Sequence, residues 1–307
     1  MVIKPSEETP QSALHLATLC QEAGFPDGVV NVVMGLGEVV GRALCEHPLV
    51  AKISFTGSPE AGAAIQRIAA PLFKRVTLEL GGKSPQIVFD DARFDDAVRG
   101  CAMGLFINQG QVCAAGSRIL VQKGIAGKFA AALAQAAQSV AVGDPSQEGV
   151  QMGPVAKKAQ YERVNRYIRQ GIDEGAELLA GGVSASAKGW FVRPTIFGSA
   201  SNQMSIAREE IFGPVGTVIE FGTEEEAIAL ANDSAYGLAA TVWTSSLERA
   251  HKVAGAMRVG AVGVNCWSPL DANLPWGGLK TSGIGREGGL PGALAYTEEK
   301  VITVLLP

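Results

Sequence analysis

The sequence predicts an α/β protein in which helices pack against a mostly parallel sheet. Short apolar runs alternate along the chain with segments of helical periodicity, and this β-α-β rhythm is typical of parallel sheets. Hydrophobic residues make up 47% of the 307 residues, enough for a substantial core and roughly two domains. The chain holds 38 glycines, against about 21 expected from average usage, so we expect many tight turns.

The N-terminal elements follow this alternation closely. The first helix is expected to have Thr9 as its cap, to begin at Pro10 and to end at Gly24. A second helix is expected from Val39 to Cys45, and a third over SPEAGAAIQRIAA. Strands are expected in VVNVVMG, AKISFTGS, VTLELGG and QIVFDD.

Beyond Asp95 the same pattern continues in longer units. Helices are expected at 95–107, 126–140, 156–175, 224–232 and 246–256. Strands are expected at 117–122, 215–220, 239–243 and 260–264. The segment AGGVSASAKGW is expected to be a surface loop, because periodic structure resumes on both sides of it.

Charge and hydropathy exclude several classes of partner. The net charge is −4 and no block of Lys and Arg is present, so we expect no nucleic-acid partner. No stretch approaches the roughly 18 uncharged apolar residues of a membrane span, and the first residues lack the pattern of a signal peptide. The sequence therefore predicts a cytoplasmic protein without membrane contact.

The five cysteines are scattered and show no CxxC spacing, so we expect neither a disulfide framework nor a metal site. Cys20, Cys45 and Cys101 lie on apolar helix faces and are expected to be core thiols. Cys266 is not assigned by its surroundings. Cys113, in GQVCAAGSR, follows a predicted helix and has small neighbours that leave room for a substrate, which makes it the candidate nucleophile.

A thiol needs a base, a dipole or a cation to become reactive. The three histidines lie away from the glycine-rich segments, which argues against a Cys-His hydrolase. Glu79 ends an apolar strand just before Gly81 and Gly82, where burial would raise its pKa toward that of a general base. The strand and helix between Glu79 and Cys113 would return the chain to the same sheet edge. A strand-end acid held by a nearby N–H, with a purely structural role, remains the alternative.

Two further segments suggest an anionic or sugar ligand. In SFTGSPEAG, a strand, a turn at Gly57, a cap at Ser58 and a proline would aim backbone N–H groups at a phosphate, although this is not a GxGxxG fingerprint. In IKPSEETP, Lys4 could bind sugar hydroxyls or phosphate, and Glu7 could accept from both ribose hydroxyls of NAD while repelling the 2′-phosphate of NADP. An ordinary strand-turn-helix junction and a solvated charge pair are the alternatives.

Seven motifs in order carry a resemblance to a known family: KPSEETP, FTGSPEAG, LELGGKSPQIVF, NQGQVCAAGSR, REEIFGPV, NDSAYGLAATVWT and PWGGLKTSGIGREGG. Together they resemble the NAD(P)-dependent aldehyde dehydrogenase superfamily, from Lys4 to Pro307. The resemblance implies that Cys113 is the nucleophile and Glu79 the general base. The thiolate would attack an aldehyde, the adduct would pass hydride to nicotinamide, and Glu79 would activate the water that hydrolyses the thioester to the acid.

The resemblance also assigns cofactor and substrate residues. Lys4 and Glu7 match adenine-ribose contacts, and the acid favours NAD, with NADP possible. The pyrophosphate turn would hold Gly57 and Ser58, and the nicotinamide-ribose contacts would be Glu210 and Phe212. The substrate entry, in which no Lys or Arg stands, would include Ile107, Val112, Ala114, Ser268 and Leu270. A neutral aliphatic or aromatic aldehyde is therefore expected as the small-molecule substrate.

The resemblance implies four regions: a partial dinucleotide-binding domain at 1–79, a thiol-bearing catalytic domain at 80–281, a return to the cofactor domain at 282–297, and an oligomerisation arm at 298–307. A homo-oligomer, either dimer or tetramer, is implied. In the family, the part before KPSEETP carries half of the cofactor sheet and an oxyanion-hole asparagine, so a truncated chain with impaired activity is expected. Losing one oxyanion donor typically costs about 10²- to 10³-fold in rate.

Two other functions remain open at this point. The first is a noncatalytic remnant that acts through association, using the exposed edge residues of EKVITVLLP. The second is a cysteine-dependent esterase or acyltransferase that uses Cys113 without nicotinamide. NAD binding would separate the dehydrogenase from both, and a product burst from an activated ester would separate the second from the first.

Overall fold

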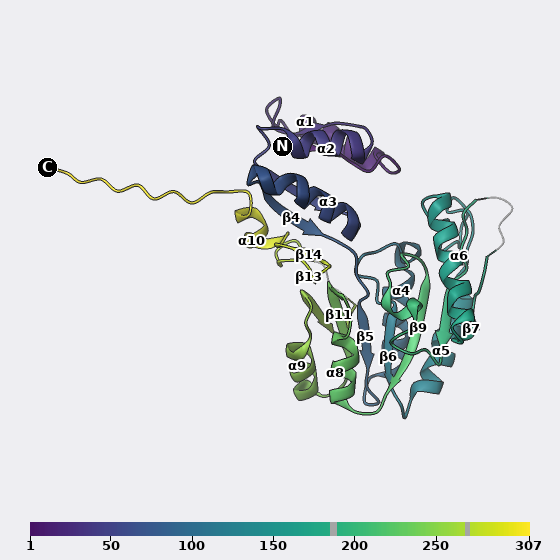
Figure 1. Cartoon of the computed structure of the whole chain (residues 1–307). Helices are drawn as coiled ribbons and strands as arrows, with labels where there is room; N and C mark the ends of the chain where they lie inside the picture. Colours follow the sequence, from purple (N-terminus) through teal and green to yellow (C-terminus); the bar gives the residue numbers. More distant parts are fainter. Residues whose placement is uncertain (185–188, 268–270) are drawn as a thin grey trace. The chain divides into compact units, whose positions relative to one another are not determined.

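The computed structural model describes residues 1–184, 189–267 and 271–307. The contacts between residues divide the chain into two compact units (Figure 1). The first unit holds Met1–Phe55 and Glu60–Val76, and the second holds Thr56–Pro59 and Thr77–Pro307. Among the described residues, none of the helices combines the length and apolar character needed to cross a bilayer.

The first unit contains short strands and small helices. Strand β1 (Val2–Ile3) runs parallel to β2 (Asn31–Val32), with helix α1 (Gln11–Glu22) between them in the sequence. The remaining elements are a π-helical turn η1 (Gly37–Gly41), α2 (Arg42–Glu46), β3 (Lys52–Thr56), α3 (Pro59–Ala69), the 3₁₀ turn η2 (Ala70–Leu72) and β4 (Arg75–Glu79); β3, α3 and β4 run partly into the second unit.

The expected start of the first helix was wrong by one residue. Pro10 has helical dihedral angles but occupies the cap position, no side chain caps the helix, and Thr9 lies outside it. The strand expected over VVNVVMG is reduced to Asn31–Val32, because only these residues find a partner in β1.

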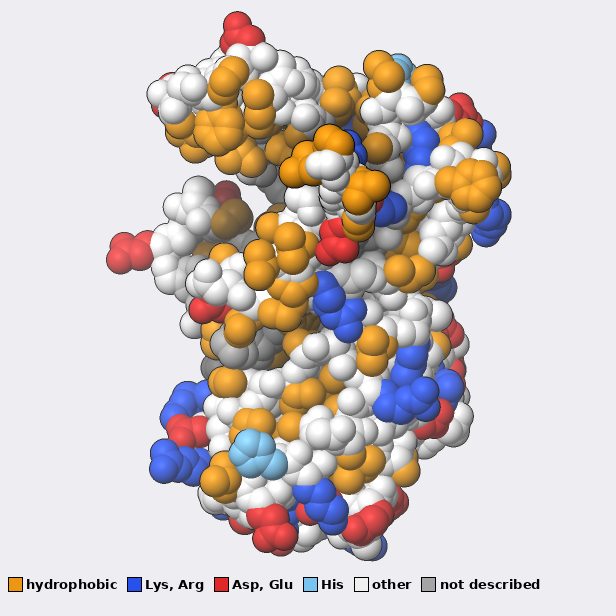
Figure 2. Space-filling model, turned by 90° about the vertical axis from the view of Figure 1, so that its left-hand side faces the viewer, with side chains coloured by type: hydrophobic (Ala, Val, Ile, Leu, Met, Phe, Trp, Pro, Cys, Tyr) orange, Lys and Arg blue, Asp and Glu red, His pale blue; other side chains and the backbone are white. Residues whose placement is uncertain are grey.

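Helix α1 buries none of its residues. Leu14, Leu16 and Leu19 are 43–50% exposed, and Cys20 is only partly buried, so the expectation of a core thiol at Cys20 was wrong. Cys45 and Cys101 are buried as expected. Hydrophobic side chains are also exposed on the face drawn in Figure 2, where they gather mainly in its upper part.

The second unit is organised around a seven-stranded sheet with the order β12-β11-β5-β6-β9-β8-β7. All neighbouring strands are parallel except β7 and β8. In chain order the strands are β5 (Pro85–Val88), β6 (Arg118–Gln122), β7 (Glu177–Ala180), β8 (Thr195–Gly198), β9 (Val215–Phe221), β11 (Ala239–Trp243) and β12 (Ala261–Val264). The parallel sheet predicted by the alternating pattern is therefore confirmed.

Helices cover both faces of this sheet (Figure 1), because successive side chains of a strand point to opposite sides. Val88, Ile119 and Val121 pack with α4 (Phe94–Phe106) and α5 (Ala126–Ser139). Their sequence neighbours on the other face, Ile87 and Leu120, pack with α8 (Glu224–Asn232) and α9 (Leu247–Ala256). A third cluster lies between α6 (Lys158–Asp173), α7 (Ser205–Arg208) and β8.

The remaining elements are short. Strand β4 has β3 on one side and β14 (Gly283–Ile284) on the other, and β10 (Tyr236–Gly237) pairs with β13 (Leu279–Lys280). Helix α10 (Gly289–Leu294) follows, and residues 298–307 form no helix or strand within this single chain. Pairing of this tail with a neighbouring subunit stays a prediction.

The five helices and four strands expected beyond Asp95 are all present, with ends shifted by at most two residues. Seven further elements are not predicted by the sequence pattern: β7, β8, α7, β10, β13, β14 and α10. These elements have two to six residues, too few for a periodic pattern, and they form only because a partner segment is nearby.

Candidate active site

Cys113 lies in a turn between helix α4 and strand β6 of the second unit. The turn is reached through three consecutive residues in the left-handed region: Asn108, Gln109 and Gly110, with φ values of 50°, 58° and 68°. Such residues cost of order 1–3 kcal/mol when they carry a side chain, so the surrounding contacts must hold them. Asn108 Nδ2 donates to the Gln111 carbonyl at 3.0 Å, and Gln111 Oε1 accepts from the Ala156 N–H at 3.0 Å.

The thiol of Cys113 is partly buried and lies among carboxylates. Burial raises its pKa, and the negative charges of Glu210 and Glu79 raise it further. Backbone N–H groups of Ala114 and Cys113 lower it in part. The sequence led us to expect a base, a dipole or a cation at the thiol, and the structure supplies two acids and two backbone donors. The thiol therefore needs an acceptor for its proton near neutral pH.

Glu79 is held by its backbone at the end of β4. Its carbonyl accepts from the Gly57 N–H at 3.0 Å, and Glu79 pairs with Gly283 of β14. The residue is 4% exposed, and neither carboxylate oxygen has a hydrogen-bond partner among the described residues. The structural alternative, a carboxylate held by a nearby N–H, is represented among these residues by the Trp276 side chain, which lowers the pKa of Glu79.

The environment of Glu79 raises its pKa to about 7. Burial is the largest cause, and the negative charge of Glu287 adds to it, whereas Arg286 opposes both. The indole N–H of Trp276 lies near enough to lower the pKa slightly without completing a hydrogen bond. A carboxyl with this pKa changes protonation state near neutral pH, as a general base requires.

The Gly81–Gly82 turn contacts both the carboxylate of Glu210 and the backbone of Cys113. The Gly82 N–H donates to Glu210 Oε1 at 3.2 Å. A Cβ on Gly82 would lie 2.3 Å from the carbonyl oxygen of Cys113, so the two backbones are in close contact. Ser282 supports this turn, since its hydroxyl donates to the Gly81 carbonyl at 2.7 Å and accepts from the Gly237 N–H at 2.9 Å.

Replacing Gly82 with alanine should lower the reactivity of Cys113 more than replacing Gly81 with alanine. At Gly82 the new Cβ meets backbone of Cys113, which cannot move without displacing the thiol. At Gly81 it meets Glu210 Oε2 at 2.3 Å, the end of a side chain that can rotate. We expect Gly82→Ala to lower the rate of Cys113 alkylation by iodoacetamide at least about tenfold more than Gly81→Ala, with a larger fall in Tm. Equal alkylation rates in the two variants would contradict the close contact.

The segment that carries Glu210 is braced by α6. Arg163 donates to the Glu210 carbonyl at 2.5 Å, and Gln160 Nε2 donates to the carbonyls of Ile211 and Phe212 at 2.9 and 2.6 Å. Phe212 has a φ of 58° and is 37% exposed. The sequence analysis did not identify Gln160 or Arg163, because neither stands in a motif.

Lys83 was also missed. Its side chain is 2% exposed and its Nζ has no hydrogen-bond partner among the described residues. A lysine after two glycines is typical of an exposed turn, so nothing in the sequence pattern signals this burial.

The expected adenine-ribose residues lie in the first unit. Lys4 Nζ donates to the carbonyls of Pro5 at 2.6 Å and Gly35 at 3.1 Å, and lies 3.5 Å from Glu7 Oε2. The Glu7 side chain is 46% exposed and that of Lys4 15%. Glu7 thus remains accessible to a ligand, and the lysine is largely occupied by the backbone.

The expected pyrophosphate turn precedes helix α3. Pro59 is the first helical residue, as expected, and both Gly57 and Ser58 are exposed. The Gly57 N–H is hydrogen-bonded to Glu79, so it is not available to a phosphate in this structure.

The expected substrate residues have different environments. Ile107 is 41% exposed at the end of α4, and Val112 is partly buried. Ala114 is 4% exposed and packs with Leu238 and Ala239, in a small cluster that also contacts Cys113. Ser268 and Leu270 lie outside the described residues.

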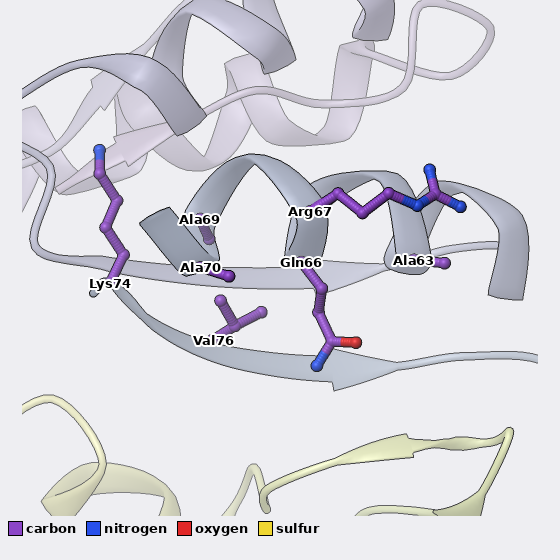
Figure 3. Close-up of a pocket in the computed structure, with 7 residues that line it drawn as sticks. All are labelled: Ala63, Gln66, Arg67, Ala69, Ala70, Lys74 and Val76. Carbon is purple, nitrogen blue, oxygen red and sulfur yellow. The ribbon is translucent and has the colours of Figure 1, made fainter. Parts of the chain in front are cut away.

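A shallow pocket in the first unit contains none of the expected site residues (Figure 3). Its volume is about 620 Å³, and it lies along α3 and the start of β4. Its lining consists of Ala63, Gln66, Arg67, Ala69, Ala70, Lys74 and Val76. It holds no acid or nucleophile, so we do not assign it to the chemistry of Cys113.

Comparison with known sequences identifies relatives across the whole chain. The model of the aldehyde dehydrogenase family matches residues 1–302. Mitochondrial aldehyde dehydrogenase of Sus scrofa is 48% identical over 308 residues, which cover 100% of this chain and 59% of that protein. The putative aldehyde dehydrogenase DhaS of Bacillus subtilis (strain 168) is 47% identical over 306 residues, covering 100% of this chain and 62% of that protein.

Solved structures of aldehyde dehydrogenases are similar to this chain as well. The NAD⁺ complex of aldehyde dehydrogenase from Bacillus cereus has a TM-score of 0.95 at 46% identity, covering 97% of this chain and 60% of that one. A mutant of aldehyde dehydrogenase C from Pseudomonas syringae, in complex with NAD⁺ and octanal, has a TM-score of 0.94 at 46% identity, covering 97% and 62%. This chain spans about 60% of the length of the relatives it matches. With its family motifs in order and its fold matched closely, the chain belongs to the aldehyde dehydrogenase family.

Proposed function

We propose that this chain provides the nucleophile and the general base for the NAD-dependent oxidation of an aldehyde to a carboxylic acid. The observation that carries the proposal is the convergence of Cys113, Glu79 and Glu210 within the second unit. Each of the two carboxylates acts on the thiol electrostatically, and Gly82 connects Glu210 to the backbone of Cys113. Family membership supports the same reaction.

In this proposal Cys113 attacks the carbonyl carbon of the aldehyde. Its sulfur forms a bond to carbon, the carbonyl oxygen takes up the electron pair of the C=O bond, and the thiol proton passes to water. The backbone N–H groups at the sulfur stabilise the thiolate as it forms. The buried setting keeps the attacking sulfur poorly hydrated, which strengthens these interactions.

Each unit holds residues of the kind that bind one part of a nicotinamide dinucleotide. The carboxylates of Glu210 and Glu7 are acceptors of the kind that bind the vicinal hydroxyls of a ribose, and we assign them to the nicotinamide and adenine riboses, with Phe212 beside the first and Lys4 beside the second. Ser58 is assigned to the pyrophosphate, whereas the Gly57 N–H is held by the Glu79 carbonyl. NAD, when bound, would supply the hydride acceptor needed to convert the adduct on Cys113 into a thioester.

Glu79 completes the reaction by accepting a proton from water. The water oxygen attacks the thioester carbon, the carbon–sulfur bond breaks, and the acid leaves while Cys113 recovers its proton. Both Glu79 oxygens lack hydrogen-bond partners, so their lone pairs are available to a water. The pKa of about 7 leaves a substantial carboxylate fraction at neutral pH.

We infer a neutral aldehyde as the substrate. The described residues assigned to the substrate entry, Ile107, Val112 and Ala114, are apolar and carry no cation for a carboxylate tail. The related enzyme from Pseudomonas syringae was crystallised with octanal, a neutral aliphatic aldehyde.

The experiment that tests the proposal combines two assays on the chain. We expect octanal and NAD to yield NADH, and p-nitrophenyl acetate to release one burst equivalent of nitrophenolate with an acetyl group on Cys113 by peptide mass spectrometry. A burst without NADH formation or NAD binding would favour the esterase alternative. Failure of both would contradict the proposed function.

Glu7→Gln should weaken discrimination against NADP. The exposed carboxylate repels a 2′-phosphate, and repulsion between exposed charges of about 1 kcal/mol corresponds to about fivefold in Kd. We expect the ratio of the NADPH to the NADH Kd, measured by fluorescence titration, to fall by about this factor. Glu8→Gln, which removes the same charge one residue away, is the control. An unchanged ratio in Glu7→Gln would remove Glu7 from the ribose site.

A further inference from the structure

Ser282 carries a buried hydroxyl to which the proposed reaction gives no role. The residue lies between β13 and β14 and is 0% exposed. Its hydroxyl donates to the Gly81 carbonyl at 2.7 Å and accepts from the Gly237 N–H at 2.9 Å, and both of these glycines are buried. Buried backbone groups need such partners, because leaving them unpaired is costly. Ser282 therefore connects two backbone segments that lie far apart in the chain.

The backbone around Ser282 pairs with the end of β4, where Glu79 lies. The Ser282 carbonyl accepts from the Leu80 N–H at 2.9 Å, and the next residue, Gly283, pairs with Glu79. Ser282 thus holds Leu80 through its main chain and Gly81 through its side chain. These are the two residues that directly follow the proposed general base.

The chain before Ser282 also contacts the Glu79 carboxylate. A Cβ on Gly277 would lie 2.9 Å from Glu79 Oε1, so the carboxylate lies against the backbone of Gly277. A Cβ on Gly278 would lie 2.5 Å from the Cβ of Ser282, so these two residues are in close contact as well. The place of the carboxylate therefore depends on how residues 277–283 pack against the end of β4.

The position of Glu79 matters because a general base must bring an oxygen within hydrogen-bond reach of the attacking water. That position is set by the end of β4 and by two neighbours of the carboxylate, Gly277 and the Trp276 indole. A misplacement of about 1 Å at a reacting group can cost on the order of 10²-fold in rate. The hydrogen bonds that fix the backbone after Glu79 should therefore affect the step in which Glu79 acts.

We propose that Ser282 is a positioning residue for the general base. Its hydroxyl fixes the Gly81 peptide and with it the end of β4, so that the Glu79 carboxylate meets the water that hydrolyses the thioester. This inference rests on the proposed function, because it assigns Ser282 to the hydrolysis step of that reaction. Attack by Cys113 on the substrate does not require the base and should depend much less on Ser282.

The turn that carries the thiol has supports that do not involve Ser282. Gln86 Nε2 donates to the Gly116 carbonyl at 2.9 Å. Trp267 Nε1 donates to the Ala114 carbonyl at 3.3 Å. Both bonds hold residues that closely follow the nucleophile, so the thiol should keep its place when the Ser282 hydroxyl is lost.

Ser282→Ala removes the hydroxyl and keeps the backbone pairing with Leu80 and Glu79. We expect the burst of nitrophenolate from p-nitrophenyl acetate to stay within about twofold of the wild-type rate, and hydrolysis of the acetyl group on Cys113 to slow about tenfold. Mass spectrometry of the Cys113 peptide gives the hydrolysis rate per acetylated Cys113, so unfolded chains do not enter it. Unchanged hydrolysis, or equal slowing of burst and hydrolysis, would overturn the proposal.

Thr281→Val is the matched control, because it removes the neighbouring hydroxyl from the same turn. The Thr281 hydroxyl donates to the Ala235 carbonyl at 2.7 Å, whereas that of Ser282 donates to Gly81. Its loss should leave both the burst and the hydrolysis rate unchanged. If Thr281→Val slowed hydrolysis as much as Ser282→Ala, the effect would not come from the bond to Gly81, and the proposal would be wrong.

Ser282→Cys keeps the proposal testable if Ser282→Ala does not fold. A thiol is close to a hydroxyl in size but is only a weak donor and acceptor, so it should hold the Gly81 carbonyl less firmly. We expect hydrolysis of the acetyl group on Cys113 to slow about threefold with the burst unchanged. Hydrolysis at the wild-type rate in this variant would contradict a role of the hydroxyl.

A double-mutant cycle tests whether the effect passes through Glu79. In a Glu79→Gln background, Ser282→Ala should change the hydrolysis rate less than about twofold, because the base that it positions is gone. The same slowing in both backgrounds would show that Ser282 acts on hydrolysis by another route, and the proposal would fail.

These outcomes are distinguishable from failure of the proposed function. If the wild-type chain gives no burst, or if Glu79→Gln hydrolyses the acetyl group on Cys113 at the wild-type rate, the proposed function itself fails. If both behave as proposed and Ser282→Ala hydrolyses the intermediate normally, only the role of Ser282 fails.

Discussion

Cys113→Ala is expected to abolish the burst of nitrophenolate from p-nitrophenyl acetate and any NADH formation from an aldehyde. The variant removes the thiol whose backbone lies against Gly82 and whose pKa is raised by Glu210 and Glu79. Loss of a nucleophile on which a covalent intermediate depends lowers the rate by at least about 10³-fold. The side chain shrinks only slightly at a partly buried turn, so Tm should change little.

Cys266→Ala is the control for Cys113→Ala. It removes a free thiol that is exposed on the same unit, and it should keep the full burst. A burst that survives in Cys113→Ala and disappears in Cys266→Ala would transfer the nucleophile to Cys266 and overturn the assignment.

Glu79→Gln is expected to leave the burst intact and to stop the steady release of product that follows it. Glutamine has nearly the same shape but cannot accept a proton from water, so the thioester on Cys113 should accumulate. General-base catalysis contributes about 10²- to 10⁴-fold, and we expect the hydrolysis of the acetyl-Cys113 intermediate to slow by that factor. Mass spectrometry of the trapped acetyl group measures it.

Hydrolysis of the acetyl-Cys113 intermediate should depend on pH through the protonation of Glu79. The base form of Glu79 is the carboxylate, and its pKa is raised to about 7, so hydrolysis of the intermediate should be lost as the pH falls through 7. Glu287→Gln removes the negative charge that raises this pKa, and should move the inflection to lower pH. Arg286→Gln removes the positive charge that lowers it, and should move the inflection to higher pH. Shifts in the same direction for both variants would be inconsistent with an electrostatic origin at Glu79.

Local pattern was sufficient for the sheet and its helices. Apolar residues on both sides of strands such as Ile87–Val88 and Ile119–Val121 require cover on both faces, and the helical periodicities before and after them supply it. A strand that is apolar on both faces must be covered by a helix on each face. The alternation of such strands with helices along the chain therefore predicts both the order of the elements and the parallel sheet. The small residues around Cys113 likewise marked a turn before any fold was known.

The sequence by itself therefore determined the order of the elements, the parallel sheet and the family, and it marked Cys113 and Glu79 as candidates for the reaction, because each is encoded in a short run of residues or in an ordered set of motifs. Only the tertiary structure decided that Glu79 and Glu210 both raise the pKa of Cys113, that Lys83 is buried, and that α1 is left exposed. Burial and charge-charge distances depend on segments far apart in the chain, and the solvation of a side chain is a property of what packs over it.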